Sequence, residues 1–447
     1  MFKKTTTLLV LFSFSLPAYS GQAIERENHF SKANAYTVKV KKRVKYPFIK
    51  DKKGAFSGAG FLIEKNLGWI VTNAHVSSRN PESLDVAFKG SKFIEAKLHY
   101  IDHLLDFAVI KIAPGKVPDK AQVADLDCTN KPVVGSPAGA FGHPYSLSFS
   151  GTRGIISGEK YKWGRLWIQT DAPINKGNSG GPLISLNTGK VIGISSATLS
   201  KKRSEGLGFA VPMIHACKVI DLLKKGVEPS PSYIPVGFAY DEDNESELIA
   251  AVIYKKQPIS WPLQVGDRLV AMANNPAREF ENQASLIHTL RGVKGEVDVI
   301  IERSGKKQTV SITSKPRTSL MKRIGVHVSG VVIANDTFRD DEETNPKGLP
   351  MIHDVATASI GSAAGISSYD LVVSVDGQPP APSLRKLCNY LKKAEQSKKK
   401  VNIITKSGSW SYRSRSKYAS HKIKVKDVKL VGPQAPKGCG SVKTDDN

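Results

Sequence analysis

The segment Gln-Thr-Asp-Ala-Pro-Ile-Asn-Lys-Gly-Asn-Ser-Gly-Gly-Pro-Leu occupies residues 169–183 and decides how the rest of the chain is interpreted. It places Ser179 in a glycine-rich turn between two strands. Glycine permits backbone conformations that aim neighbouring N–H groups at one point, as stabilisation of an oxyanion requires. Gly177, Asn178 and Ser179 are therefore the candidate oxyanion hole, and a plain glycine turn is the simpler alternative.

Two earlier segments supply the partners that a nucleophilic serine requires. A serine hydroxyl reacts poorly at neutral pH and needs a neighbouring base, which a carboxylate orients and stabilises. His75 ends one apolar strand, and Asp106 opens another that alternates at period two. Asp102 competes for the carboxylate role, but we favour Asp106 because it leads directly into the apolar strand. His75, Asp106 and Ser179 are the predicted catalytic residues.

The rest of the chain divides into an all-β region and two repeated segments. Short strands separated by turns run from about residue 35 onward and predict a barrel or sandwich. Pro212 then opens a helix expected over residues 213–225, and a proline-rich linker follows at residues 228–232. Residues 233–315 and 320–407 repeat the same pattern of strands, a turn, a helix and two strands, so they indicate a duplicated small domain.

Three segments resemble the active-site blocks of the HtrA/Deg (high-temperature-requirement) family of envelope serine proteases. They are residues 72–76, 106–109 and 177–183, and residues 168–172 and 207–212 are similar to further blocks of the family. The similarity runs from about residue 56 to residue 226. It implies a mostly β chain, with a chymotrypsin-like double β-barrel followed by PDZ domains of the α+β class.

The same resemblance implies an activity and an assembly. It implies an ATP-independent serine endopeptidase that degrades misfolded or unfolded envelope proteins, built as a trimer or a larger homo-oligomer. By position, Phe209 and Ala210 would border the specificity pocket, and a strand without acidic residues suits small or aliphatic substrate side chains. A long regulatory loop of the best-studied members corresponds to residues 46–57, which are short and basic here, so self-inhibition by this loop is not expected.

The two repeated segments look like PDZ domains. Such a domain holds a peptide C-terminus with backbone N–H groups of one loop while the peptide adds a strand to the sheet edge. The loops are expected at Val236, Gly237 and Phe238 and at Ile324, Gly325 and Val326. Helices near residues 283–291 and 383–393 would form the opposite walls. Tyr369 stands where the turn usually has glycine, and a PDZ fold used only for packing is the alternative.

The expected domain limits follow from these patterns. They are a signal peptide (1–20), a trypsin-like protease domain (21–227), a first module (228–316), a second module (317–410) and a basic C-terminal tail (411–447). Residues 1–20 combine a basic start, an apolar stretch and a small-residue cleavage site, as a secretory signal does. The mature protein is therefore expected in the periplasm, with secretion from the cell as the second choice.

The net charge of +25 over 447 residues invites a nucleic-acid interpretation. The basic runs lack interleaved aromatic residues, and the positive charge gathers at the two ends of an exported chain. We expect solvated basic surfaces and no nucleic-acid partner. Peripheral contact with an anionic envelope surface is the alternative.

Four cysteines exclude a disulfide-dense scaffold but allow two bridges in an exported protein. A Cys388–Cys439 bridge would pin the tail to the last helix. Cys128 and Cys217 form the second candidate pair, although Cys217 is equally suited to be a buried free thiol. No His/Cys spacing is typical of zinc, so neither a metal nor a cofactor is expected.

Two other function classes stay open. A non-proteolytic chaperone or scaffold would keep the same fold and bind peptides, and a polyanion-binding protein would show binding that falls steeply with salt. The presence of all three catalytic residue types favours the peptidase.

Overall fold

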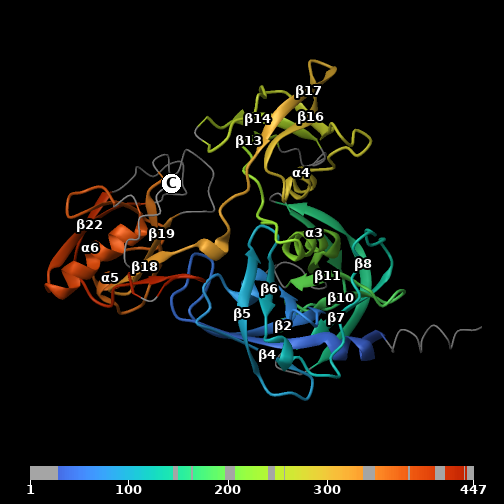
Figure 1. Cartoon of the computed structure of the whole chain (residues 1–447), viewed down its shortest axis with the longest axis horizontal. Helices are drawn as coiled ribbons and strands as arrows, with labels where there is room; N and C mark the ends of the chain where they lie inside the picture. Colours follow the sequence, from blue (N-terminus) through green and yellow to red (C-terminus); the bar gives the residue numbers. More distant parts are fainter. Residues whose placement is uncertain are drawn as a thin grey trace, which may run out of the picture.

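The computed structural model describes residues 29–143, 149–162, 165–196, 207–239, 247–255, 257–335, 348–380, 383–407, 418–436 and 438–439. Figure 1 shows a double barrel, coloured blue to green, with a yellow unit and an orange-red unit attached on different sides of it. The expected signal peptide lies outside the described residues. Within the described ranges, no helix is long and apolar enough to cross a membrane.

The first barrel is a closed sheet of strands in the order β1-β2-β3-β6-β5-β4. Its strands are β1 (Thr37–Val44), β2 (Gly54–Glu64), β3 (Trp69–Thr72), β4 (Ser83–Phe88), β5 (Ile94–Asp102) and β6 (Phe107–Lys111). In β1, Val38 and Val40 are buried, whereas Lys41 and Arg43 are exposed. Alternate side chains thus face the barrel interior and the solvent, which places part of the basic N-terminal charge on the outer surface.

The second barrel is also closed, in the order β10-β11-β12-β9-β8-β7. Its strands are β7 (Pro137–Gly142), β8 (Ser150–Lys162), β9 (Arg165–Thr170), β10 (Pro182–Ser185), β11 (Val191–Ser196) and β12 (Gly208–Pro212). A short 3₁₀ turn, η1 (Pro114–Lys116), lies in the connection between the barrels. The two barrels confirm the predicted mostly β, chymotrypsin-like architecture.

Helix α3 (Met213–Lys224) follows β12 at once and confirms the helix expected after Pro212. Its N-cap proline has a φ of −60°, which suits the start of a helix. A disulfide joins Cys217 of α3 to Cys128 in the connection between the barrels. The proposed Cys128–Cys217 pair is confirmed, and Cys217 is not a free thiol.

The first module contains a five-stranded sheet whose spatial order follows the sequence. Its strands are β13 (Val236–Phe238), β14 (Leu248–Ile253), β15 (Arg268–Met272), β16 (Gly295–Arg303) and β17 (Lys306–Ser314). Helix α4 (Gln283–Leu290) begins with a capping box formed by Asn282 and Ser285. The fully buried Leu286 and Leu290 of α4 pack into the core of this module. Strand β13 lies at one edge of the sheet.

The second module contains a seven-stranded sheet in the order β23-β22-β21-β20-β19-β18-β24. Its strands are β18 (Gly325–Val328), β19 (Val331–Asn335), β20 (Pro350–Val355), β21 (Leu371–Val375), β22 (Lys400–Lys406), β23 (Tyr418–Lys424) and β24 (Lys429–Val431). Its helices are α5 (Ile360–Ala363) and α6 (Leu384–Gln396), and the 3₁₀ turn η3 (Leu320–Lys322) precedes β18.

The sheet of the second module runs past the end that the sequence predicted at residue 410. Strands β23 and β24 come from the expected tail, and they pair with β22 and β18. The sequence did not predict them because their register and burial depend on contacts with these distant strands. The disulfide between Cys388 of α6 and Cys439 is formed, so this predicted pair is confirmed. We keep the name second module for the unit from residue 317 to Cys439.

The first module meets the barrels through a buried ion pair. The Arg291 guanidinium, just after α4, lies 2.6 Å from the Asp102 carboxylate at the end of β5, and both side chains are almost fully buried. The contact is an ion pair rather than a well-aligned hydrogen bond, while a second Arg291 nitrogen donates to the Pro229 carbonyl at 2.6 Å.

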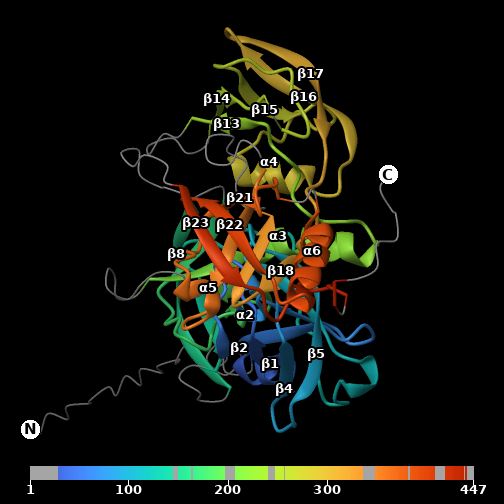
Figure 2. The same ribbon diagram turned by 90° about the vertical axis from the view of Figure 1, so that its left-hand side faces the viewer.

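The second module receives the connection between β1 and β2 of the first barrel, and Figure 2 shows it in front of that barrel. Phe48 of this connection is fully buried in the core cluster of the second module. The backbone N–H of Ile49 donates to Nδ1 of His353 at 3.1 Å. The sequence analysis expected residues 46–57 to be too short for self-inhibition and gave them no other role. In the structure they contact the second module and attach it to the first barrel.

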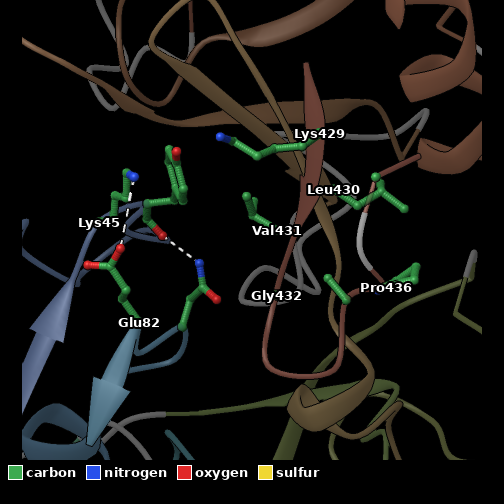
Figure 3. A pocket seen from close by; sticks show the side chains of 11 residues that line it. Lys45, Glu82, Lys429, Leu430, Val431, Gly432 and Pro436 are labelled. Atoms are coloured by element: carbon green, nitrogen blue, oxygen red, sulfur yellow. Dashed lines mark hydrogen bonds and ion pairs between the residues drawn. The ribbon is translucent and has the colours of Figure 1, made fainter. Parts of the chain in front are cut away.

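A pocket of about 360 Å³ opens beside this junction. Figure 3 shows Lys45 and Glu82 of the first barrel on one side and Lys429, Leu430 and Val431 of β24 on the other. Lys45 and Glu82 form an ion pair at 3.9 Å across the end of the barrel. The pocket therefore lies between the protease region and the C-terminal strand.

Candidate active site

Strand pairing brings two of the predicted catalytic residues together. Strands β3 and β6 are antiparallel neighbours, with Thr72 opposite Ala108. His75 lies in the single-turn helix α2 (Ala74–Ser77) just beyond β3, and Asp106 immediately precedes β6. Nδ1 of His75 is 2.9 Å from Oδ2 and 3.1 Å from Oδ1 of Asp106. This contact lets the carboxylate fix the orientation of the imidazole and stabilise its protonated form.

Further hydrogen bonds hold the Asp106 carboxylate. Its Oδ1 accepts from the His75 backbone N–H at 3.1 Å, and its Oδ2 accepts from the Ser196 hydroxyl at 3.0 Å. Burial alone raises the pKa of Asp106, but the neighbouring His75 charge and the hydrogen bonds outweigh it and hold the pKa below its ordinary value. Asp106 is therefore an ionised partner for His75 at neutral pH.

Asp106 has an unusual backbone conformation, which a neighbouring side chain stabilises. The residue has a φ of 54°, in the left-handed region that side-chain-bearing residues rarely adopt. The Asn73 side-chain amide donates to the Asp106 carbonyl at 3.0 Å. This hydrogen bond joins the segment that carries His75 to the backbone of Asp106 and so helps to hold the unusual backbone conformation of Asp106.

Ser196 is a site residue that the sequence analysis missed. It ends β11 of the second barrel, whereas Asp106 belongs to the first barrel. Its hydrogen bond to Asp106 therefore links the two barrels at the site. No local motif marks Ser196, since it follows an ordinary apolar strand and only the closure of both barrels brings it to the carboxylate.

Asp102, the alternative carboxylate, is occupied elsewhere. Its Oδ1 accepts from the Leu105 backbone N–H at 3.0 Å, and its Oδ2 faces Arg291 of the first module. Asp106 is thus the carboxylate that contacts His75, and Asp102 is the one that joins the barrel to the first module.

Ser179 lies where the two barrels meet. The turn that carries it precedes β10, and its carbonyl accepts from the Ala59 N–H of the first barrel at 2.8 Å. The following Gly180 donates to the Ser195 carbonyl of the second barrel at 2.8 Å. Gly180 has a φ of +85°, and a Cβ there would lie 2.2 Å from both the Ala59 carbonyl and the Thr72 hydroxyl. Glycine is therefore required beside the serine.

The turn before Ser179 is fixed by its own hydrogen bonds. The Asn178 backbone N–H donates to the Asn175 carbonyl at 3.0 Å, so it acts inside the turn rather than as a donor to a ligand. Gly177 has a φ of +108°, and its carbonyl accepts from the His143 N–H at 3.1 Å. His143 is another residue that the sequence analysis missed, and burial lowers its pKa to about 4. His143 is therefore neutral at neutral pH, and its ring packs against Phe149 while its backbone N–H holds the turn.

The two residues expected at the specificity pocket lie on β12. Ala210 is fully buried and pairs with Ile168 of β9 and with Ser195 of β11. Its apolar neighbours in the second barrel include Ile168, Leu183 and Ile192. Phe209 is nearly buried and pairs with Ser196. The β12 residues are thus uncharged and adjoin the strand that ends at Ser196.

The expected carboxylate-binding residues lie mostly in strands. Val236, Gly237 and Phe238 form β13, whose pairing partner is β14. Ile324 precedes β18, whereas Gly325 and Val326 lie within it. The two strands differ in their neighbours. Among the described strands, β13 is the last strand of its sheet, whereas β18 pairs with β24 on its outer side. Across the residues with a described placement, no cluster of three His, Cys, Asp or Glu side chains suited to a metal is found.

Comparison with known proteins identifies the domain. Residues 58–194 match the trypsin-like peptidase domain model. The "Probable periplasmic serine endoprotease DegP-like" of Pseudomonas putida is 31% identical over 277 residues, which cover 57% of this chain and 55% of the relative. The "Periplasmic pH-dependent serine endoprotease DegQ" of Escherichia coli is 28% identical over 340 residues, covering 71% of this chain and 72% of the relative.

Further similarities agree with these. The "Serine endoprotease DegS" of Salmonella typhimurium is 29% identical over 281 residues, covering 57% of this chain and 76% of the relative. The solved structure of "HtrA-type protease AlgW with tripeptide" matches with a TM-score of 0.51 and 23% identity over 66% of this chain and 97% of that chain, a likeness of fold. The chain thus spans little more than half of the Pseudomonas relative and about three quarters of the other two curated relatives.

The double barrel and the His75–Asp106–Ser196 hydrogen-bonded cluster, together with the matched model, define a trypsin-like serine peptidase domain. In sequence the chain is similar to the DegP-like, DegQ and DegS serine endoproteases, which agrees with the resemblance to the HtrA/Deg family.

Proposed function

We propose that this protein is an ATP-independent serine endopeptidase of the periplasm that degrades misfolded or unfolded proteins. The observation that carries the proposal is the contact between His75 and Asp106, reinforced from the second barrel by Ser196. The names of the relatives support it, since they are serine endoproteases and two of them are called periplasmic.

In the proposed reaction, the Ser179 hydroxyl attacks the carbonyl carbon of a peptide bond, and Nε2 of His75 takes its proton. Asp106 stabilises the resulting imidazolium. The His75 proton then passes to the leaving amine, and the acyl-enzyme forms. Water attacks this ester while His75 accepts the water's proton, and transfer of that proton to Ser179 releases the acid and restores the enzyme.

We assign the oxyanion-stabilising role to the backbone N–H groups of Gly177 and Ser179. Asn178 supports them by closing the turn through its bond to Asn175. Donors that converge on the developing negative charge lower the barrier, and removal of one typically costs about 2.7–4 kcal/mol. The turn thus has to be held rigid, which the hydrogen bonds of Ser179 to Ala59 of the first barrel and of Gly180 to Ser195 of the second barrel support.

Hydrolysis of unfolded casein by the purified protein tests this function. Ser179→Ala should abolish cleavage, while Ser83→Ala on the exposed edge of β4 should leave it unchanged as a matched control. Activity that persists in Ser179→Ala would overturn the assignment. A wild-type protein that prevents casein aggregation without cutting it would support the chaperone alternative instead.

We also propose that Phe209 and Ala210 border a pocket for small or aliphatic substrate side chains. Their support is the uncharged β12 strand and the apolar surroundings of Ala210. A library of peptides that vary at the residue before the cleaved bond should show a preference for Val, Ala or Ile. Efficient cleavage only after Lys or Arg would contradict this specificity.

The remaining partners are proposals as well. We propose PDZ character for both modules, capture of peptide C-termini by the first module through Val236, Gly237 and Phe238, and a homo-oligomeric assembly, with a trimer as its unit. Among the described strands β13 pairs only with β14, and the edge that this leaves supports peptide capture. The mass of the purified assembly in solution tests the oligomer, since a strictly monomeric protein would contradict it.

We also propose peripheral contact with anionic lipid, which the exposed Lys41 and Arg43 support. Binding of the protein to vesicles of phosphatidylglycerol tests this contact.

A further inference from the structure

The outer edge of β18 is occupied by the chain's own C-terminal segment. Strand β24 runs antiparallel to β18, with Val431 opposite Gly325, Leu430 opposite Val326 and Lys429 opposite His327. Figure 3 shows this strand beside the junction with the first barrel. In the first module the corresponding edge strand β13 pairs only with β14 within the described part of the chain.

The direction of β24 is the direction of a peptide in a strand-addition site. In such a site the peptide pairs with the edge strand, and its end points to the backbone N–H groups before that strand. Val431 lies opposite the first residue of β18, and the chain then passes Arg323, because a Cβ on Gly432 would lie 2.2 Å from the Arg323 carbonyl. The segment thus approaches the loop at Ile324, where a peptide end was expected.

The side chains of this segment fill an apolar groove. Val428, Leu430 and Val431 are each buried to 95% or more. They share a core cluster with Leu387 and Leu391 of α6, the helix expected to form the opposite wall. The Val428 backbone N–H donates to Oε1 of Glu395 on α6 at 3.3 Å. The segment therefore binds both walls of the groove, through main-chain pairing on one side and packing on the other.

A covalent bond keeps the segment in place. Cys439 follows β24 and is bonded to Cys388, a fully buried residue on the same helix α6. The Leu430 N–H also donates to the Gly438 carbonyl, so the chain after β24 folds back onto it. A tether of this kind gives the strand a high effective concentration at the groove, against which a free peptide must compete.

We propose that the groove between β18 and α6 is a peptide-binding groove whose resident ligand is the chain's own residues 428–431, held there by the Cys388–Cys439 disulfide. This inference rests on the proposed PDZ character of the second module. It assigns capture of external C-termini to the first module and makes the second a closed, structural unit docked on the first barrel. The ligand class is an extended peptide that ends in large aliphatic residues.

The test uses the full chain with the strand released. The variant combines Cys388→Ser and Cys439→Ser with Leu430→Asp, which puts a charge on the buried face of β24. The probe is the synthetic peptide Lys-Val-Lys-Asp-Val-Lys-Leu-Val, the sequence of residues 424–431, with a free C-terminal carboxylate. Hydrogen exchange followed by mass spectrometry reads the amides of residues 325–335 with and without this peptide.

In the wild type these amides should exchange slowly and should not respond to the peptide. In the variant they should exchange at least tenfold faster and be protected again by saturating peptide. A matched control with Cys128→Ser, Cys217→Ser and Tyr418→Asp should leave residues 325–335 as in the wild type, because Tyr418 is exposed. Unchanged exchange in residues 400–406 shows that the module remains folded.

Three results would overturn the proposal: peptide protection of residues 325–335 in the wild type, unchanged exchange in the released variant, or released amides that the peptide does not protect. If the triple variant unfolds, the Cys388→Ser/Cys439→Ser variant with intact β24 decides. Its strand stays joined to β23 by the short segment after Lys424, so peptide above the roughly millimolar effective concentration of a short linker should be needed to displace it. Casein cleavage is read separately, so a failure of the peptidase proposal leaves this exchange result interpretable.

Discussion

His215 of α3 and His288 of α4 stack face to face, with ring centroids 3.9 Å apart and an interplanar angle of 9°. This pair lies at the junction between the protease domain and the first module. Burial lowers the pKa of His215 to about 4, and nearby Arg291 acts in the same direction. Burial, His215 and Arg291 also hold the pKa of His288 well below its ordinary value. Both rings are therefore neutral at pH 7.

This junction should weaken in acid. A histidine in an unfolded chain has a pKa of about 6.5, so a lowered folded pKa makes the folded state resist protonation. The stabilising contribution is complete above about pH 6.5 and is lost as the pH falls toward 4. We expect the thermal midpoint of unfolding to fall over this range, together with faster hydrogen exchange in α4.

The variant His215→Gln/His288→Asn should flatten this pH dependence while it keeps a partner for Arg291. The side-chain oxygen of the introduced asparagine can accept the hydrogen bond that Nε of Arg291 donates to His288. Other buried histidines, such as His143 and His353, titrate in both proteins and cancel in the comparison. Identical slopes for the variant and the wild type between pH 6.5 and 4 would contradict the role of the pair.

Ser196 should matter for catalysis through Asp106. Ser196→Ala removes a hydrogen bond to a charged carboxylate, typically worth about 1.5–3 kcal/mol, so kcat/KM should fall by roughly 10- to 100-fold. The pKa of Asp106 should rise, and the acid limb of the pH–rate profile should move to higher pH. Ser195→Ala is the matched control, because the buried Ser195 hydroxyl has no hydrogen-bond partner among the described residues. Equal effects of the two changes would contradict the positioning role of Ser196.

Phe48 should hold the second module on the first barrel. Phe48→Ala leaves a cavity in the core of that module, and such truncations cost about 3–5 kcal/mol. Limited proteolysis by an added protease, carried out in the Ser179→Ala background, should then cut the chain between the modules faster. Phe56→Ala serves as control, since that ring is 40% exposed in the same hairpin. Equal cleavage rates for the two variants would show that Phe48 does not anchor the module.

Gly180→Ala should abolish activity while the fold survives. The added Cβ would meet carbonyl and hydroxyl oxygens at 2.2 Å, so the Ser179 turn must move away from His75. Gly135→Ala has a comparable φ of +84° but no neighbour within 4 Å, so it carries the backbone strain alone. That strain costs on the order of 1 kcal/mol and should leave casein cleavage intact. An active Gly180→Ala protein would show that the turn tolerates displacement.

The strand pattern alone predicted a barrel or sandwich, and the resemblance of three short active-site segments to the HtrA/Deg family implied the double barrel. Burial alternates along strands such as β1, so the all-β architecture is visible without long-range information. The contact of Asp106 with His75 follows from the pairing of β3 with β6, which only the structure shows.

Other features depend on contacts between distant segments and leave no local pattern. Ser196 reaches Asp106 only because both barrels close, and Phe48 is an ordinary loop residue until the second module packs on it. Strand β24 is three residues long, too short for periodicity to distinguish it from a tail. Its pairing with β18 needed the three-dimensional structure.

Reaction with a fluorophosphonate, which forms a covalent bond to an activated serine hydroxyl, tests the central claim most directly. Mass spectrometry of the digested protein should find the label on Ser179 in the wild type. His75→Ala should reduce the labelling rate by at least 100-fold, and Asp106→Asn should also slow it. A folded wild-type protein that is not labelled at Ser179, or one whose labelling is unaffected by His75→Ala, would contradict the assignment of these residues as a catalytic triad.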